Sequence, residues 1–355
     1  MPNMLGAYGD WAAGLAKQPK RRATRDDFLA ALMQPDAGGV PKASLIHQLE
    51  FDGLSIEHLN WQLPYGPPTE AIFLKPAGAQ GRLPGVIALF DHGGNKYFGT
   101  AKITRMGNEV HPMVQGIQQQ LYGGRAWANE LARRGYAVLV ADVFAFGSRR
   151  IRLDDVPANI RGAATEDDIR SYNTFAGTHE HIIAKSLFSA GTTWPGVFTA
   201  EDQRAIDYLC SRPDVDPARI GCAGLSGGGL RTVYLTGVDR RIRCSCCAGM
   251  MTTWHDFILN KSSSHTWMVY VPGLANHLDY AAIMGLNAPS PVMVLNNRED
   301  QLFTVSEMER ADQILSAAYK GHEDRYQMKF YPGPHKFDVP MQEDAFKWLD
   351  RWLKS

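Results

Sequence analysis

Ser226 stands among glycines in the pentapeptide Gly224-Leu225-Ser226-Gly227-Gly228. An apolar run over 220–223 precedes it and helix-compatible residues over 230–235 follow, so we expect the serine at a sharp turn from a strand into a helix. Glycine two positions before and two positions after the serine removes the side chains that would clash in such a turn. A hydroxyl held there lies beside the first N–H groups of the helix, which suits a nucleophile.

A base and an acid follow Ser226 in the order that this chemistry requires. A serine hydroxyl needs a base to take its proton, usually a histidine oriented by a carboxylate. Asp300 follows a predicted strand over 291–296, and His335 follows a predicted strand over 326–331. Both therefore lie at the same edge of the sheet as Ser226. Glu299 is the rival acid, but two consecutive side chains are unsuited to orient one imidazole, so we favour Asp300.

The turn Asp91-His92-Gly93-Gly94-Asn95 directly follows an apolar strand over 86–90. Attack on a carbonyl group builds negative charge on its oxygen, and backbone N–H groups must already point at that oxygen. We predict that the amide of Gly227 supplies one donor and the amide of Gly94 the other, with Asn95 as the alternative to Gly94.

Further side chains are candidates for the wall of a substrate pocket. Aromatic rings in long connections either floor a pocket or pack a lid, and both interpretations stay open. The candidates are His92, Asn95, Trp194, Trp254 and Trp267. Three histidines of the last long connection are further candidates, namely His255, His265 and His277.

The segment His179-Glu180-His181 raises the question of a metal site. Residues two apart share a face only in an extended segment, and on a helix they diverge by about 200°. Since no third ligand follows at a recognisable spacing, we interpret the segment as solvated or structural. The sequence predicts no metal site and no cofactor.

Strands and helices alternate along most of the chain. Short apolar runs predict strands over 86–90, 136–141, 220–223, 242–248, 291–296 and 326–331, with helices over 125–134, 199–209 and 306–320 and a closing helix through Trp348 and Trp352. Apolar strands alternating with helices predict a mostly parallel sheet covered on both faces. Three earlier strands over 45–51, 55–62 and 69–74 have no helices between them, so we expect an antiparallel N-terminal edge.

The chain divides into an extension and one large domain. Residues 1–44 are predicted to be a helical N-terminal extension, with helical residues over 10–13 and a cap at Thr24 before Phe28. Residues 45–355 form the α/β domain, with insertions at about 95–124, 146–198 and 252–290. All three insertions leave from the carboxyl ends of strands, where α/β sheets bind ligands, so we expect them to form the walls and lid of a pocket.

Composition excludes several classes of partner. Apolar residues make up 45% of the 355, and 37 basic residues balance 37 acidic ones. Such a chain has no global field to recruit nucleic acid or an anionic membrane. No apolar run is long enough to span a bilayer. The first residues lack a signal-peptide pattern, so we expect a cytoplasmic protein, although a mature secreted form would read the same.

The five cysteines do not form a disulfide framework. Their number is odd, and three of them crowd into 244–247 within a predicted strand. Cysteine in such a strand behaves as a small buried apolar residue, so we place these three in the core.

Together these residues resemble the α/β-hydrolase superfamily, and within it the serine esterases of the acetyl-xylan-esterase and dienelactone-hydrolase-like branch. The resemblance covers roughly 45–355. It rests on the Asp91-His92-Gly93-Gly94 turn, the elbow around Ser226, and the motifs Leu131-Ala132-Arg133-Arg134-Gly135-Tyr136, Asp142 with Gly147, Arg212-Pro213-Asp214-Val215-Asp216 and Gly333-Pro334-His335-Lys336-Phe337. Dienelactone hydrolases use a cysteine nucleophile, and this chain has Ser226 instead. The N-terminal extension and the 146–198 segment lie outside the minimal fold.

The resemblance implies a serine hydrolase that cleaves carboxylic esters through Ser226, His335 and Asp300. Its expected partner is a small-molecule ester carrying an acetyl or short acyl group, with carbohydrate esters among the options. A homo-oligomer is left open. The alternatives are a peptidase similar to the prolyl-oligopeptidase catalytic domain and an inactive binding protein that keeps the fold.

Overall fold

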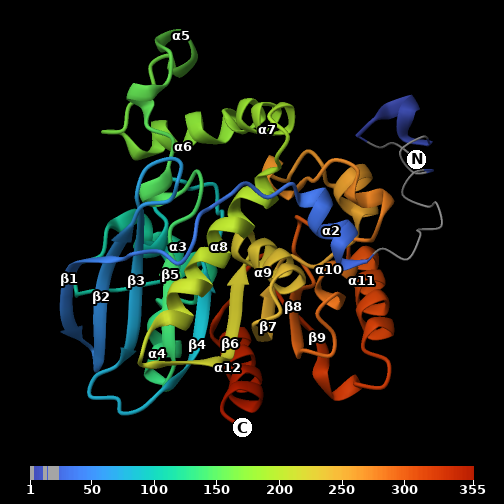
Figure 1. The fold of residues 1–355 in the computed structure, drawn as a ribbon. Helices are drawn as coiled ribbons and strands as arrows, with labels where there is room; N and C mark the ends of the chain where they lie inside the picture. Colours follow the sequence, from blue (N-terminus) through green and yellow to red (C-terminus); the bar gives the residue numbers. More distant parts are fainter. Residues whose placement is uncertain (1–3, 11–13, 15–23) are drawn as a thin grey trace.

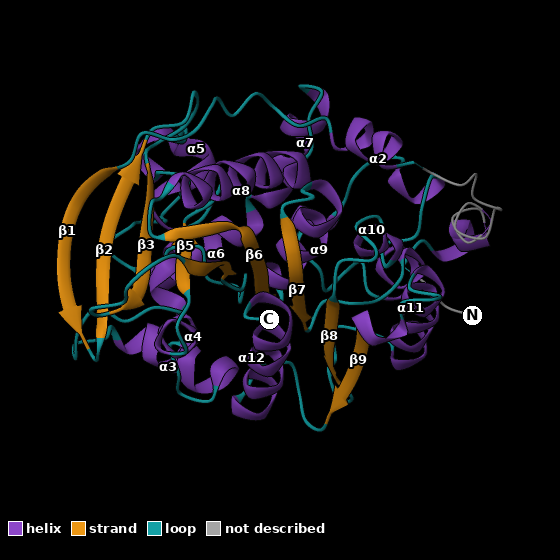
Figure 2. Cartoon of the chain, turned by 60° about the horizontal axis from the view of Figure 1, so that its bottom comes forward, coloured by secondary structure: helices purple, strands orange, loops and turns teal. Residues whose placement is uncertain are grey.

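A single nine-stranded sheet forms the centre of the protein. The computed structural model describes residues 4–10, 14 and 24–355. The sheet has the strand order β1-β2-β3-β5-β4-β6-β7-β8-β9, and it twists from one end of the molecule to the other (Figures 1 and 2).

The sheet is antiparallel at its N-terminal end and parallel elsewhere. β1 pairs with β2, β2 with β3 and β3 with β5 in antiparallel register, and all pairs from β5 to β9 are parallel. The strands are β1 (Ser44–Phe51), β2 (Leu54–Trp61), β3 (Thr69–Pro76), β4 (Leu83–Leu89), β5 (Ala137–Ala141), β6 (Val215–Leu225), β7 (Ile242–Ala248), β8 (Val292–Asn297) and β9 (Tyr326–Tyr331). The prediction of a mostly parallel sheet with an antiparallel edge is confirmed.

Helices cover both faces of the sheet. On one face α4 (Trp127–Arg133) packs on β3 and β5, and α12 (Val339–Leu353) packs on β6 and β7. On the other face α8 (Trp194–Ser211) and α9 (Gly227–Val238) pack on β4 and β6 and on each other. The two helical layers are visible on either side of the strands in Figure 2. α11 (Val305–Ala318) packs on β9 at the far edge.

One predicted helix boundary is wrong. The sequence placed the start of α8 at the polar residues Thr199 and Asp202, but the helix begins at Trp194. The hydroxyl of Thr193 accepts a hydrogen bond from the amide of Gly196 and so caps the helix. Asp202 is buried, and its carboxylate pairs with the guanidinium of Arg231 at 2.6 Å. Asp202 is therefore one half of a buried ion pair and does not cap the helix.

The N-terminal extension is partly described. α2 (Arg25–Leu32) begins at Thr24, whose side chain and backbone exchange hydrogen bonds with Asp27, so the predicted cap is confirmed. A short 3-10 turn covers Gly6–Tyr8. The helix predicted over 10–13 falls largely on residues 11–13, which lie outside the described residues.

The three insertions contain short helices and turns. In order they contain α3 (Pro112–Tyr122); α5 (Ala158–Arg161), α6 (Ile169–Thr178) and α7 (Glu180–Ser189); and α10 (Ala282–Gly285) with several short turns. In Figure 1, α5, α6 and α7 project above the sheet, on the side to which the β6 arrow points. The second insertion therefore lies at the carboxyl ends of the parallel strands.

The core extends through both helical layers. The cysteines at 244, 246 and 247 are buried and free, as expected for core positions in β7. Across residues 4–10, 14 and 24–355, every helix is too short or too polar to cross a bilayer.

Candidate active site

Ser226 occupies a strained turn between β6 and α9. Its φ of 57° and ψ of −118° are rare for a residue with a side chain. A Cβ at Gly224 would lie 2.5 Å from the backbone carbon of Gly228, and a Cβ at Gly228 would lie 2.0 Å from the carbonyl oxygen of Leu89. Glycines at these two positions thus let the elbow close against the end of β4, as the sequence predicts.

His335 and Asp300 form a hydrogen-bonded pair beside this elbow. The two atoms joined, His335 Nδ1 and an Asp300 carboxylate oxygen, lie 2.6 Å apart. Asp300 is only 3% exposed, and its other oxygen accepts a hydrogen bond from the amide of Leu302. Within the described part of the chain, Nε2 of His335 is buried and has no hydrogen-bond partner. Gly249 leaves space for the ring, because a Cβ there would lie 3.0 Å from His335 Cε1.

Glu299 points away from this imidazole. Its carboxylate instead accepts a hydrogen bond from the backbone N–H of Gly333. The two neighbouring acids therefore have separate tasks: Glu299 binds the turn that carries His335, and Asp300 contacts the imidazole itself.

The turn after β4 lies against the elbow. A Cβ on Gly227 would approach the backbone nitrogen of His92 to 2.6 Å, so these two backbone segments are in direct contact. The amide of Gly94 lies in the same turn, and it donates a hydrogen bond to Nδ1 of His92 at 3.1 Å. The structure thus brings together the segments that carry the two predicted N–H donors, Gly227 and Gly94.

A buried lysine, Lys102, donates hydrogen bonds to the turn that follows β4. Lys102 is fully buried, and its ammonium group donates to the carbonyl oxygens of Asp91 (2.7 Å) and His92 (2.9 Å). The carboxylate of Asp91 lies 3.3 Å from the same ammonium group and accepts a hydrogen bond from the Tyr122 hydroxyl. One buried ammonium group thus bonds the carbonyl oxygens of two consecutive residues of the turn.

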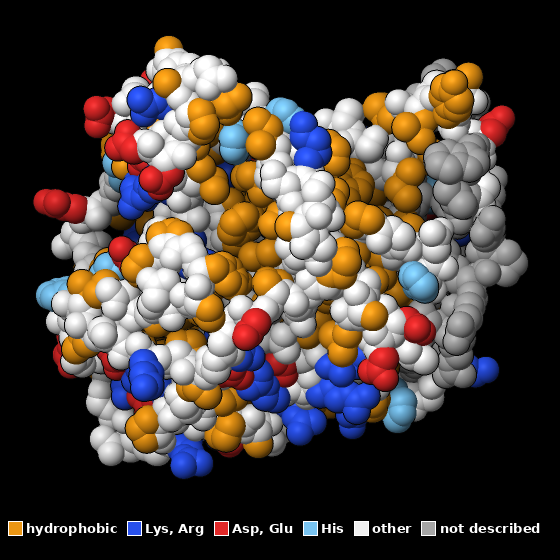
Figure 3. All heavy atoms as spheres, turned by 45° about the horizontal axis from the view of Figure 1, so that its top comes forward, with side chains coloured by type: hydrophobic (Ala, Val, Ile, Leu, Met, Phe, Trp, Pro, Cys, Tyr) orange, Lys and Arg blue, Asp and Glu red, His pale blue; other side chains and the backbone are white. Residues whose placement is uncertain are grey.

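Ser226, His92, Gly94 and His335 all line one cavity of about 420 Å³. Each insertion adds to its wall: the first supplies Leu121, the second a segment of α6 and α7, and the third the residues 263–266. Viewed from the side of the insertions, the surface is hollowed in its middle, and hydrophobic side chains line much of the hollow (Figure 3).

The predicted pocket residues separate into two groups. His92 lines the cavity, and so does His265 of the third insertion. The others lie outside its wall: Trp194 and Trp254 are buried in the core, Trp267 is 43% exposed, and Asn95 is buried with its amide against the sulfur of Met113. For Trp194 and Trp254, packing is the interpretation that the contacts support.

Glu180 lines the cavity and is buried, whereas the sequence placed it in a segment interpreted as solvated or structural. Its carboxylate contacts His92 Nε2 at 2.7 Å and Lys96 Nζ at 2.5 Å. Burial alone raises the pKa of Glu180, but the His92 hydrogen bond and the Lys96 charge outweigh burial and hold that pKa well below its usual range. Burial also lowers the pKa of His92, more than the Glu180 hydrogen bond raises it.

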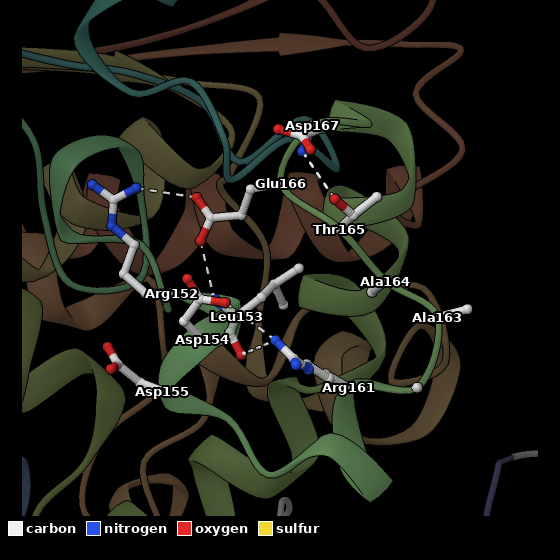
Figure 4. A pocket seen from close by; sticks show the side chains of 11 residues that line it. Arg152, Leu153, Asp154, Asp155, Arg161, Ala163, Ala164, Thr165, Glu166 and Asp167 are labelled. Carbon is white, nitrogen blue, oxygen red and sulfur yellow. Dashed lines mark hydrogen bonds and ion pairs between the residues drawn. The ribbon is translucent and has the colours of Figure 1, made fainter.

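A larger hollow of about 770 Å³ lies in the second insertion, where residues 152–155 and 161–167 line it, and Ser226 is not part of its wall. Figure 4 shows two ion pairs among its lining residues, Arg152 with Glu166 and Arg161 with Asp154. Since these charges already have partners, we assign no chemistry to this hollow.

Comparisons with known proteins bear on the fold of the chain. No protein-family model matches the chain. It is 27% identical over 288 residues to the Bacillus subtilis (strain 168) protein named "Putative hydrolase YtaP", covering 80% of this chain and 83% of that protein.

Solved esterase structures share the fold. A putative acetyl xylan esterase from Bacteroides fragilis NCTC 9343 superposes with a TM-score of 0.67 at 16% identity, over 92% of this chain and 83% of that one. A glucuronoyl esterase from Solibacter usitatus gives a TM-score of 0.62 at 14% identity, over 92% and 91%. The resemblance inferred from the motifs is thereby confirmed at the level of fold: the chain has the α/β-hydrolase fold, and esterases are among its structural neighbours.

Proposed function

We propose that this protein is a serine hydrolase that cleaves carboxylic esters of small molecules through an acyl-enzyme intermediate. The observation that carries the proposal is the state of His335. One nitrogen of its ring is held by the buried carboxylate of Asp300 at 2.6 Å, and the other has no partner in the described residues. The ring lines the same cavity as Ser226. This is the arrangement that a general base for a serine nucleophile needs.

Acylation uses the three side chains in sequence. The hydroxyl oxygen of Ser226 attacks the ester carbonyl carbon, and its proton passes to Nε2 of His335. Asp300 accepts the Nδ1–H hydrogen bond throughout and stabilises the positive charge on the ring. When the tetrahedral intermediate collapses, His335 returns the proton to the departing alcohol, and the acyl group stays on Ser226.

The negative charge on the carbonyl oxygen needs N–H donors. We assign them to the amide of Gly227, at the start of α9, and to the amide of Gly94. Since the Gly94 N–H also has His92 Nδ1 as a partner, it has to be shared with the oxyanion in the transition state.

Deacylation repeats the cycle with water as the nucleophile. His335 Nε2 takes a proton from water, hydroxide attacks the acyl carbon, and the proton returns to Ser226 as the acid leaves. A cavity of about 420 Å³ suits an acetyl or short acyl group better than a long chain. Two neighbours in fold act on carbohydrate esters by name, which makes sugar acetates suitable first substrates to test.

The decisive test replaces Ser226 with alanine. Ser226→Ala should abolish turnover of p-nitrophenyl acetate and labelling by a fluorophosphonate probe, while circular dichroism stays unchanged. Full turnover by this variant would refute the proposal. Wild-type protein that cleaves a chromogenic peptide amide faster than the ester would indicate a peptidase instead. Folded wild-type protein that neither turns over esters nor takes up the probe would indicate an inactive binding protein.

A further inference from the structure

Four hydrogen-bond donors converge on the carboxylate of Glu180, the first residue of α7. One oxygen contacts His92 Nε2 (2.7 Å) and Lys96 Nζ (2.5 Å), and the other accepts from the Thr266 hydroxyl (2.6 Å) and the Trp267 amide (3.0 Å). The side chain is about 6% exposed. A carboxylate has about four acceptor sites, so Glu180 has none left for a substrate or a metal ion.

The partners of His92 fix its tautomer. Glu180 is ionised and only accepts, so Nε2 of His92 carries the proton. The Gly94 amide only donates, so Nδ1 of the same ring is the acceptor. The ring is also held edge-on against Phe146, with centroids 5.3 Å apart. Glu180, the His92 ring and the Gly94 amide thus form one directed chain of hydrogen bonds.

We propose that Glu180 is a positioning residue for ester hydrolysis: through the Nε2–H tautomer of His92 it holds the 92–94 turn in the shape that stabilises the oxyanion. This inference rests on the proposed function, because it assigns the turn a role in that reaction. Glu180 also joins α7 to the third insertion through Thr266 and Trp267. Glu180 therefore links the 92–94 turn to both the second and the third insertion.

Only a carboxylate satisfies this site. In Glu180→Gln, one of the two carboxylate oxygens is replaced by an NH₂ group, which faces donors on either side. If the NH₂ group faces His92, the ring must move its proton to Nδ1, where it opposes the Gly94 N–H. If it faces Trp267, the amide of Trp267 loses its acceptor. Either outcome disturbs the turn or its link to the third insertion.

The first experiment measures p-nitrophenyl acetate hydrolysis by Glu180→Gln, normalised to the number of sites that a fluorophosphonate probe labels at completion. We expect kcat per labelled site to fall about 10- to 100-fold, because small displacements of catalytic groups have effects of this size. KM should change by less than about threefold, since the oxyanion contact forms in the transition state.

Asp202→Asn is the matched control, because it also converts a buried, paired carboxylate to an amide but lies outside the cavity wall. It should lower thermal stability and leave kcat per labelled site unchanged. An unchanged kcat per labelled site in Glu180→Gln would overturn the positioning role. Wild-type activity and Ser226 labelling report separately on the proposed function, so the two failures are distinguishable.

A double-mutant cycle tests whether Glu180 acts through His92. If it does, adding Glu180→Gln to His92→Asn should lower kcat by less than about threefold. The same full loss in both backgrounds would overturn the proposed route.

The tautomer itself can be read without disturbing Glu180. ¹⁵N spectra of the wild-type protein should show His92 as a neutral ring protonated at Nε2, with His92→Asn used to assign its signals. A ring protonated at Nδ1, or at both nitrogens near neutral pH, would overturn the proposal even if Glu180→Gln does not fold.

Discussion

Two histidines contact buried carboxylates at the same cavity, and their environments differ at one nitrogen. His335 pairs with Asp300 at 2.6 Å, and His92 pairs with Glu180 at 2.7 Å. The second nitrogen of His335 has no partner in the described residues, whereas the second nitrogen of His92 accepts the Gly94 amide.

This comparison teaches that a histidine–carboxylate pair does not by itself identify a base. A general base needs a nitrogen that is available to the reacting proton. In His92 both nitrogens already take part in hydrogen bonds, so the same pair of groups becomes a support for the backbone. The second nitrogen, and not the carboxylate, distinguishes the two roles.

Exchanging each histidine for asparagine is the sharpest way to break this comparison. His335→Asn should lower kcat/KM for p-nitrophenyl acetate by roughly 10⁵- to 10⁶-fold, since no base remains for Ser226. His92→Asn should lower it by only about 10- to 100-fold, because the base and nucleophile are intact and only the turn is disturbed. Steady-state rates on both variants decide the matter. Equal losses would mean that the two pairs are not functionally distinct.

Substituting Glu299 and Asp300 separately tests which of the two acids orients His335. Asp300→Asn should lower kcat on the order of 10⁴-fold, because an amide cannot hold the reactive tautomer of His335. Glu299→Gln should stay within about threefold of wild type, since this carboxylate contacts the backbone of Gly333 and not the ring. The kinetics of both variants, compared at one pH, test the assignment. A crippled Glu299→Gln beside an active Asp300→Asn would reverse it.

The two pairs also differ in how far the sequence predicts them. Asp300 and His335 each follow a strand of the parallel sheet, and carboxyl ends of parallel strands meet at one edge. Their approach to Ser226 follows from the order of strands and turns. The same reasoning predicted nearly every strand to within a few residues, because buried parallel strands are continuous apolar runs.

The sequence did not predict the contacts of Glu180, because no strand positions this residue. It lies in the second insertion, and its partners come from the turn after β4 and from the third insertion. How such insertions dock depends on side-chain packing between segments far apart in the chain, which periodicity does not encode. The two histidines of the His179-Glu180-His181 segment raised the question of a metal site, but the residue of this segment that lines the cavity is Glu180.

The smallest expected effect is a difference between wild type and Glu180→Gln in how the free energy of unfolding depends on pH. At pH 7, Glu180→Gln should lower the free energy of unfolding by about 3–5 kcal/mol, because it leaves the charge of Lys96 buried without a counter-ion. The pKa of Glu180 in the folded protein is below its ordinary value of 4.5, so the folded state holds this proton less tightly than the unfolded state does. Stability from this group is therefore complete above pH 4.5 and is lost as the pH falls through the lower, folded value.

The difference in unfolding free energy between wild type and Glu180→Gln should consequently shrink as the pH falls below 4.5. Urea unfolding of both proteins at several pH values measures it. In the variant the amide at position 180 does not titrate, so acidification removes no contribution from this side chain. A difference that grew on acidification would mean that Glu180 is protonated in the folded protein. A protonated Glu180 could not accept all four hydrogen bonds, and the directed chain from Glu180 through His92 to Gly94 would lose its starting point.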